Sequence, residues 1–304
     1  MPVIKADNAK ILQARVDDRR TTPNWRPIHR IESPSASLEE VGRALETYTF
    51  EKLVYAEGDS WFDKFTPLFA PDTNLLDALR LPMFVGVVDV SHIGDISDDM
   101  VSGIQGLRTK NMFEKLDFDA ILFSGGGNDL KNLFANEYLQ QGSPVNVEYD
   151  AFFDKVIQNI KDFVAMRDQF GSKQTRQAPI LVNGYEYLQP RPVKGTILGD
   201  LLKVAGPWIY PCMQHAGLND GAMLDAVKKA IDKLNERLAR EIAILPNVFV
   251  IDQRGVLTLA EPGSTSVSGD WLDEIHPTAQ GFEKLAQHRW NAALADGLGW
   301  KALS

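Results

Sequence analysis

The sequence predicts a three-layer α/β/α fold built on a doubly wound, parallel sheet of about five strands. Two observations lead to this prediction. Short apolar runs alternate along the chain with longer segments whose apolar residues recur every three or four positions, the pattern of strands alternating with amphipathic helices. Several of the runs also stop at glycine or at a small polar residue, as strands do where they enter a turn.

The first fifty residues differ from the rest. Residues 1–36 mix charges with prolines and show no sustained period, which predicts an arm that packs on the main domain. Ser37 and Glu40 have the spacing of a capping box, which predicts a leading helix directly after them. We therefore expect an N-terminal arm with a leading helix over residues 1–50 and a main domain over 51–304.

Five apolar runs predict the strands of the main domain, and helical spacing predicts the segments between them. The expected strands cover residues 53–56, 83–90, 120–123, 179–182 and 248–251, and the expected helices cover 74–81, 97–116, 149–170, 221–244 and 278–294. Residues 186–220 have no regular period and are predicted to form an insert that overhangs the carboxyl edge of the sheet, where such folds place specificity.

Composition limits the classes of partner. A formal net charge of −9 and a pI near 5.1 argue against nucleic acid or an anionic membrane, because proteins approach those surfaces with lysine and arginine. The single cysteine, Cys212, excludes an intramolecular disulfide and a cysteine-based metal cluster. The N-terminus shows no signal-peptide core, and no apolar run could span a bilayer, so we expect a soluble, cytoplasmic protein. The oligomeric state is left open.

Four short motifs follow the predicted strands in a fixed order. They are Gly-Asp-Ser-Trp at 58–61, Ser-His-Ile-Gly at 91–94, Gly-Gly-Asn-Asp at 126–129, and Asp-Glu-Ile-His at 273–276. The carboxyl ends of parallel strands lie at one edge of a sheet, so the fold would gather all four motifs there. That edge would then hold a serine, an acid, a base and oxyanion donors, which together suit acyl transfer.

The serine and the histidine have the chemistry of a nucleophile and its base. Ser60 falls just past the first predicted strand, and Asp273 and His276 lie close enough in one loop for the carboxylate to fix the imidazole tautomer. Each motif also has a simpler interpretation. Gly-Asp-Ser is common in turns and helix caps, and a lone histidine before a helix is often a capping or surface residue.

The glycines at 125–127 indicate close approach of the backbone to a ligand, or positive φ. Asn128 could offer its side-chain amide to an oxyanion, while Asp129 is predicted to cap the segment that follows. A phosphate-cradling loop is the rival interpretation, but no Gly-Lys-Ser or Gly-Lys-Thr ending is present. Gly94 could add a backbone donor, although a glycine after a strand is commonly only a turn, and Gly86 and Gly103 are weaker substitutes.

In this combination and order the motifs resemble the SGNH hydrolases, also called the GDSL esterase and lipase superfamily. The resemblance covers residues 53–294 and implies a flavodoxin-like sheet of five parallel strands with no metal or other cofactor. It also implies Ser60 as the nucleophile, Asp273 and His276 as the rest of the triad, and an oxyanion hole made by Ser60, Gly94 and Asn128. Two departures are the tryptophan directly after Gly-Asp-Ser and the absence of an asparagine and an extra glycine around Gly94.

Two further segments resemble parts of such a site. Trp61 lies close enough to Ser60 to wall an acyl or alcohol pocket, although its spacing also fits the core. Residues 183–187, Asn-Gly-Tyr-Glu-Tyr, are similar to a glycine-tyrosine-acid-tyrosine segment of some family members and are predicted to be structural.

The leading hypothesis is a serine esterase that hydrolyses a carboxylic ester through an acyl-enzyme. Its substrate would be a small-molecule or glycan-linked ester, such as a short-chain acyl or acetyl ester. A thioesterase or lysophospholipase with the same residues is the alternative within enzymes. A non-catalytic ligand-binding module of the same fold and a phosphate-binding α/β protein are the alternatives from other classes.

Overall fold

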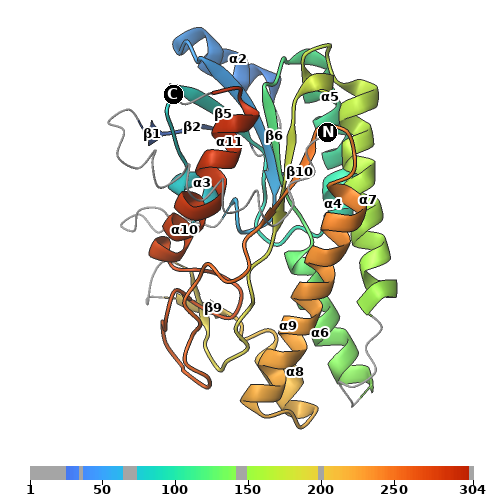
Figure 1. Ribbon diagram of the computed structural model, residues 1–304, viewed down its shortest axis with the longest axis vertical. Helices are drawn as coiled ribbons and strands as arrows, with labels where there is room; N and C mark the ends of the chain where they lie inside the picture. The colour runs from blue at the N-terminus through green and yellow to red at the C-terminus, as the bar shows by residue number, and fades with distance from the viewer. Residues whose placement is uncertain (1–24, 34–36, 64–73, 142–148, 198–201, 301–304) are drawn as a thin grey trace.

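A six-stranded parallel sheet forms the centre of the computed structural model (Figure 1), which describes residues 25–33, 37–63, 74–141, 149–197 and 202–300. The strand order is β10-β7-β6-β3-β5-β2, and every neighbouring pair is parallel. The strands are β2 (His29–Glu32), β3 (Lys52–Gly58), β5 (Val85–Asp89), β6 (Ala120–Ser124), β7 (Ile180–Gly184) and β10 (Val248–Asp252). The predicted doubly wound α/β architecture is confirmed.

The sixth strand, β2, comes from the region predicted to be an arm without a strand in the sheet. It lies at the sheet edge beside β5, and only Ile31 of its four residues is buried. An edge strand with one apolar anchor has no apolar run in its sequence, so periodicity could not reveal it. A short antiparallel pair, β1 (Arg26–Pro27) with β4 (Arg80–Leu81), ties the same region to the main domain.

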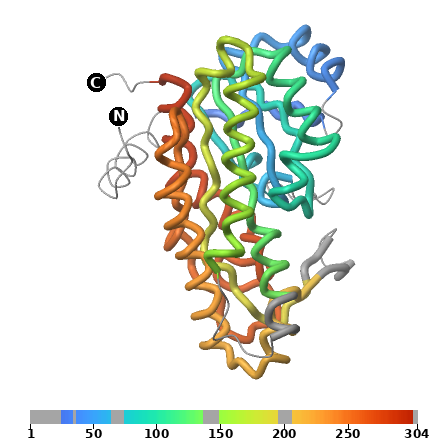
Figure 2. Tube along the Cα trace, turned by 90° about the vertical axis from the view of Figure 1, so that its right-hand side faces the viewer, coloured from blue at the N-terminus to red at the C-terminus, as the bar shows by residue number. Residues whose placement is uncertain are grey.

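Helices cover both faces of the sheet, as Figures 1 and 2 show from two directions. One face carries α3 (Leu75–Ala78), α10 (Ala279–Leu285) and α11 (Asn291–Gly297), and the other carries α4 (Ser97–Val101), α5 (Gly103–Lys115), α7 (Tyr149–Phe170) and α9 (Asp220–Arg237). The remaining helices are α2 (Leu38–Thr47), α6 (Gly127–Gln141) and α8 (Tyr210–His215). Ser37 accepts a hydrogen bond from the Glu40 N–H at 3.4 Å, so the serine caps the leading helix α2 as predicted.

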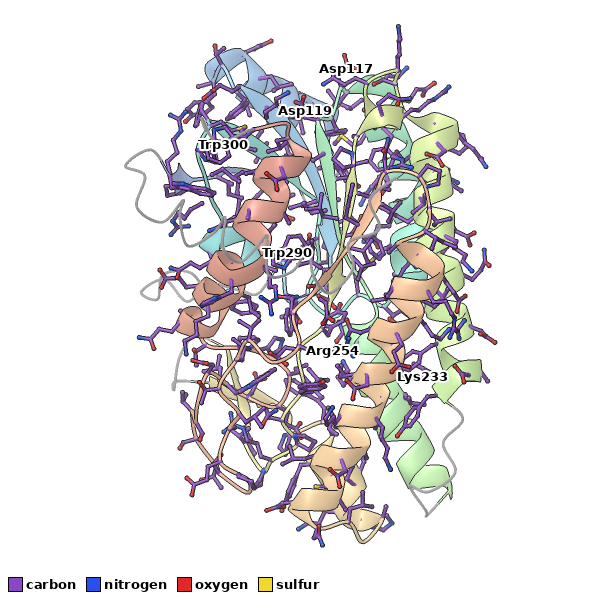
Figure 3. All side chains as sticks on the ribbon, viewed as in Figure 1. Asp117, Asp119, Lys233, Arg254, Trp290 and Trp300 are labelled. Carbon is purple, nitrogen blue, oxygen red and sulfur yellow. The ribbon has the colours of Figure 1, made fainter. Side chains whose placement is uncertain are left out.

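Three predicted helices are interrupted, and α6 was not predicted because its apolar residues do not gather on one side. The helix expected over 97–116 breaks at Ser102, where Gly103 takes a φ of +55° and starts α5. Turns of π-helix follow α9 over Leu238–Ile242 and separate α10 from α11 over Ala286–Trp290. Trp290 turns inward from this second turn (Figure 3), and its ring meets that of Phe62 edge to face at 5.8 Å.

The insert at 186–220 contains more regular structure than its sequence indicates. A hairpin of β8 (Gly195–Ile197) and β9 (Leu202–Ala205) precedes α8, and Figures 1 and 2 place the insert at the end of the molecule beyond the carboxyl ends of the strands. Strands of three and four residues are too short to show a period of two in the sequence. The prediction that this stretch is irregular was wrong, because two short strands and a helix form in it.

Candidate active site

Ser60, His276 and Asp273 form a continuous hydrogen-bonded chain, although 216 residues separate the serine from the histidine. The Ser60 Oγ lies 2.8 Å from His276 Nε2, and His276 Nδ1 lies 2.8 Å from Asp273 Oδ2 and 2.9 Å from Oδ1. The exposed fractions are only 4% for the serine, 5% for the histidine and 1% for the aspartate. This is the geometry of a nucleophile, a base and the acid that orients the base.

The Asp273 carboxylate stabilises the loop that carries both the acid and the base. Asp273 Oδ1 accepts hydrogen bonds from the backbone N–H groups of Ile275 at 3.0 Å and of His276 at 2.8 Å. Thr278 then caps α10 by accepting from the Gly281 N–H at 3.0 Å. One carboxylate therefore fixes both the backbone and the ring of the histidine.

Two backbone donors of the predicted oxyanion hole remain available. Among the described residues, none accepts a hydrogen bond from the N–H of Ser60 or of Gly94. Gly94 lies in an exposed turn after β5 with a φ of +94°, a conformation that favours glycine. Gly86 instead lies inside β5, packed on Phe50, and Gly103 begins α5, so neither glycine offers a turn at this position.

The side chain of Asn128 is hydrogen-bonded to the turn that contains Gly94. Its side-chain Nδ2 donates to the backbone oxygen of Asp95 at 2.9 Å, and its Oδ1 accepts from Lys131 Nζ at 3.1 Å. An amide NH₂ group has two hydrogens, so one remains for an oxyanion. The oxyanion-hole assignment of Ser60, Gly94 and Asn128 stays a prediction, with geometry that leaves a donor free on each.

Asp59 anchors the nucleophile turn across two neighbouring strands, a role that the sequence did not reveal. Its Oδ1 accepts from the Trp61 N–H and from Ser124 Oγ, both at 3.0 Å, and its Oδ2 accepts from the Tyr185 hydroxyl at 2.5 Å. Burial raises the pKa of Asp59 to about 6, although these three donors oppose the shift. Tyr185 belongs to the segment that was predicted to be structural, and it is 1% exposed.

Side chains of the protein occupy the space beside the glycine loop that follows β6. A Cβ on Gly127 would lie 2.7 Å from Tyr185 Cε1 and 3.0 Å from Asp59 Oδ2, and Gly126 takes a φ of +117°. A carboxylate beside the loop disfavours a phosphate, which weakens the phosphate-loop interpretation. Asp129 was predicted to cap the segment that follows it, but its carboxylate accepts hydrogen bonds from the N–H and Oγ of Ser97, at the start of α4, at 2.8 and 3.0 Å.

Trp61 is 3% exposed and packs in the core. Its indole N–H donates to the Ile275 backbone oxygen at 3.1 Å, and its ring meets those of Tyr185 and Phe282 edge to face. This burial favours the core interpretation over a pocket wall. A different tryptophan, the half-buried Trp208, lies edge-on to the His276 ring with centroids 6.0 Å apart, and it belongs to the insert that was predicted to overhang the carboxyl edge.

An open pocket of about 650 Å³ lies beside the Gly94 turn and is lined by both its neighbours, Ile93 and Asp95, and by the start of α5. In the part of the chain that the structure describes, no group of three or more histidine, cysteine, aspartate or glutamate side chains is placed to hold a metal ion. None of the described helices is both long and apolar enough to cross a membrane.

No family model and no curated protein matches the chain. Similar solved structures include a lipase from a goat rumen metagenome (17% identity, TM-score 0.42, covering 78% of this chain and 95% of that chain). A carbohydrate acetylesterase family member from Sinorhizobium meliloti shares 14% identity at a TM-score of 0.40, over 82% of this chain and 100% of that chain. An extracellular lipase from Streptomyces rimosus shares 14% identity at a TM-score of 0.42, over 80% and 99%.

All three structures have TM-scores below 0.5, so the function proposed for this chain depends on the geometry of its own site.

Proposed function

We propose that this protein is a serine esterase of the SGNH type that hydrolyses a carboxylic ester with a short acyl group through an acyl-enzyme. The observation that carries the proposal is the continuous contact from Ser60 Oγ through the imidazole of His276 to the Asp273 carboxylate. A serine hydroxyl is a weak nucleophile at neutral pH, and a base oriented in this way is what activates it.

The first half of the reaction forms the acyl-enzyme. His276 Nε2 takes the proton of Ser60 Oγ while the oxygen attacks the ester carbonyl carbon, and the N–H groups of Ser60 and Gly94 with the Asn128 amide bind the oxyanion. His276 then gives its proton to the alcohol oxygen as the carbon–oxygen bond breaks, and the alcohol leaves. Asp273 stabilises the imidazolium during both transfers.

The second half releases the acid. His276 removes a proton from water as the water oxygen attacks the acyl carbon, and it returns that proton to Ser60 Oγ when the carbon–serine bond breaks. The N–H groups that bound the first oxyanion bind the second one as well. The cycle therefore regenerates the serine and the neutral histidine without a cofactor.

A thioesterase or lysophospholipase would use the same residues on a longer acyl chain, and a binding module would have no need of the Ser60–His276 contact. The test is turnover of p-nitrophenyl esters from acetate to palmitate by the wild type, by Ser60→Ala and by Ser172→Ala as a matched serine control. Ser172 bonds Asp117, which Figure 3 labels at the opposite end of the molecule from the insert. We expect turnover that is highest on short chains, lost in Ser60→Ala and retained in Ser172→Ala. Equal turnover by Ser60→Ala and the wild type would remove the serine from the mechanism.

A further inference from the structure

A buried carboxylate of the catalytic loop binds the segment of the insert that carries Trp208. Glu274 stands between Asp273 and His276, and it is fully buried. Its Oε2 accepts hydrogen bonds from the backbone N–H groups of Trp208 and, at 3.0 Å, of Ile209, while its Oε1 accepts from the Tyr210 N–H at 2.6 Å. Three successive backbone donors on one side chain fix the position of the insert relative to the catalytic histidine.

The side chain of Trp208 packs on a glycine two residues before it in the chain. A Cβ on Gly206 would lie 3.0 Å from Cε3 of the Trp208 ring, so the indole packs directly on that backbone. The ring also reaches the catalytic centre, where it lies roughly perpendicular to the His276 ring with centroids 6.0 Å apart. Trp208 is only partly buried, so it can contact a bound molecule as well as the histidine.

The position beside His276 belongs to one half of an ester. The histidine must protonate the leaving oxygen, so that oxygen lies within about 3 Å of Nε2 when the carbon–oxygen bond breaks. The acyl oxygen points instead to the oxyanion donors. A side chain next to the imidazole therefore borders the alcohol half.

We propose that Trp208 determines the specificity for the alcohol half of the ester and that Glu274 is the residue that positions it. This inference depends on the proposed esterase function. The indole offers a flat apolar surface, which suits an alcohol that itself has a flat apolar face, such as an aryl ring or the CH face of a sugar ring.

The test separates the two halves of the substrate. One series keeps acetate and varies the alcohol (phenyl, p-nitrophenyl, ethyl and an O-acetylated methyl glycoside), and the other keeps p-nitrophenol and varies the acyl chain. In Trp208→Ala we expect kcat/KM on the aryl and glycoside acetates to fall by about 2- to 12-fold relative to ethyl acetate. Among the p-nitrophenyl esters, the kcat/KM values of Trp208→Ala should keep the order and ratios of the wild type, because all these esters have the same alcohol.

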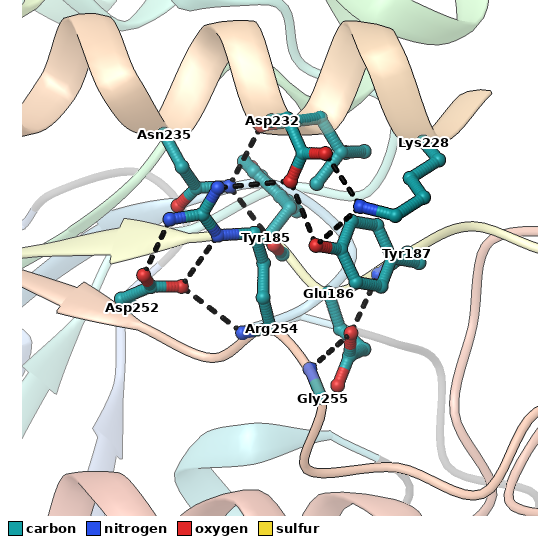
Figure 4. Close-up of polar contacts among 10 residues, drawn as sticks. Tyr185, Glu186, Tyr187, Lys228, Asp232, Asn235, Asp252, Arg254 and Gly255 are labelled. Atoms are coloured by element: carbon teal, nitrogen blue, oxygen red, sulfur yellow. Dashed lines mark hydrogen bonds and ion pairs between the residues drawn. The ribbon is translucent and has the colours of Figure 1, made fainter. Parts of the chain in front are cut away.

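Glu274 has a matched control elsewhere in the chain. Glu186 is another fully buried carboxylate that clamps a loop. It accepts hydrogen bonds from the N–H groups of Gly255, Val256 and Leu257 at 2.9, 2.7 and 3.0 Å, and Figure 4 shows the contact with Gly255. Glu274→Gln should shift the aryl-to-ethyl ratio in the same direction as Trp208→Ala, whereas Glu186→Gln should leave the ratio at its wild-type value. The double variant Trp208→Ala/Glu274→Gln should shift the ratio no further than Trp208→Ala alone, because both changes act through one contact.

Several outcomes would overturn the assignment. Trp208→Ala could leave the kcat/KM ratios among the acetates unchanged, or change only the ratios among the p-nitrophenyl esters. Either result would show that the tryptophan does not border the alcohol. An equal shift in Glu186→Gln would show that Glu274 acts through general loosening. A wild type that hydrolyses no ester would refute the proposed function and this inference with it, whereas wild-type turnover with unchanged ratios would refute the inference alone.

Discussion

Replacing Glu274 with glutamine should make the stability of the protein depend less on pH. Burial raises the pKa of Glu274 from 4.5 to about 7, even though backbone N–H groups, including those of residues 208–210, favour its ionised form. Between pH 4.5 and about 7 the folded protein therefore binds more protons at this site than the unfolded chain does. The contribution of Glu274 to stability is then fully present below pH 4.5 and is lost as the pH rises toward 7.

The size of the effect follows from the same shift. Each pH unit between the unfolded and folded pKa values corresponds to about 1.4 kcal/mol, so the rise from 4.5 to about 7 corresponds to about 3 kcal/mol. Glutamine cannot ionise, and the free energy that it loses at the clamp is the same at every pH. The wild type should therefore lose about 3 kcal/mol of unfolding free energy relative to Glu274→Gln between about pH 4 and pH 8.

Urea unfolding at half-unit steps of pH would measure this difference. The other titrating groups are shared by both proteins, so their contributions cancel in the subtraction. A difference between wild type and variant that stays constant from pH 4 to pH 8 would refute the reasoning, because it would mean that Glu274 titrates alike in the folded and unfolded states.

Three further predictions concern the reaction and its support. Asp273→Asn should lower kcat on p-nitrophenyl acetate by about 10⁴-fold, because the amide no longer holds the correct tautomer of His276. Asn128→Ala should lower kcat on the same ester by roughly 100- to 1000-fold with little change in KM, because it removes one oxyanion donor. Tyr185→Phe should cost about 1–3 kcal/mol of unfolding free energy at pH 8, because it removes a donor from the buried Asp59 carboxylate. Since the pKa of Asp59 is about 6, that cost should shrink below pH 6, and urea unfolding at pH 5 and pH 8 would measure it.

Each of these predictions has a contradicting result. Near wild-type turnover in Asp273→Asn would mean that the histidine does not need this partner. A rise in KM at unchanged kcat in Asn128→Ala would place the amide in ground-state binding. A Tyr185→Phe variant whose loss of stability is the same at pH 5 and pH 8 would show that the hydroxyl does not interact with the charge of Asp59.

The parts of the fold that sequence could predict are those with a strong local signal. Strands such as β6, buried on both faces, are continuous apolar runs, and α7 has the recurring apolar spacing of a long amphipathic helix over the predicted range 149–170. Ser60 and His276 could be paired because each follows a strand of a parallel sheet, and such strand ends meet at one edge. Local pattern and topology together were sufficient there.

The parts that sequence missed depend on partners far along the chain. Asp129 was expected to cap the segment that follows it, yet its carboxylate bonds Ser97, 32 residues away. Nothing in the sequence indicated that the Glu274 carboxylate would accept a hydrogen bond from the backbone N–H of Trp208, 66 residues earlier in the chain. A polar side chain can satisfy its hydrogen bonds locally or at a distance, and only the folded chain decides which.

The edge strand β2 also affects where the protein can be cut. Arg30 on this strand donates from Nε to the buried Asp89 carboxylate at 3.1 Å and from Nη1 to Asp77 at 2.7 Å. A fragment that began at residue 51, where the main domain was expected to start, would leave Asp89 buried without its cation and the outer edge of β5 unpaired. An unpaired sheet edge is a template for pairing with other chains. For expression and crystallisation, the stable unit therefore includes β1 and β2 and does not start at residue 51.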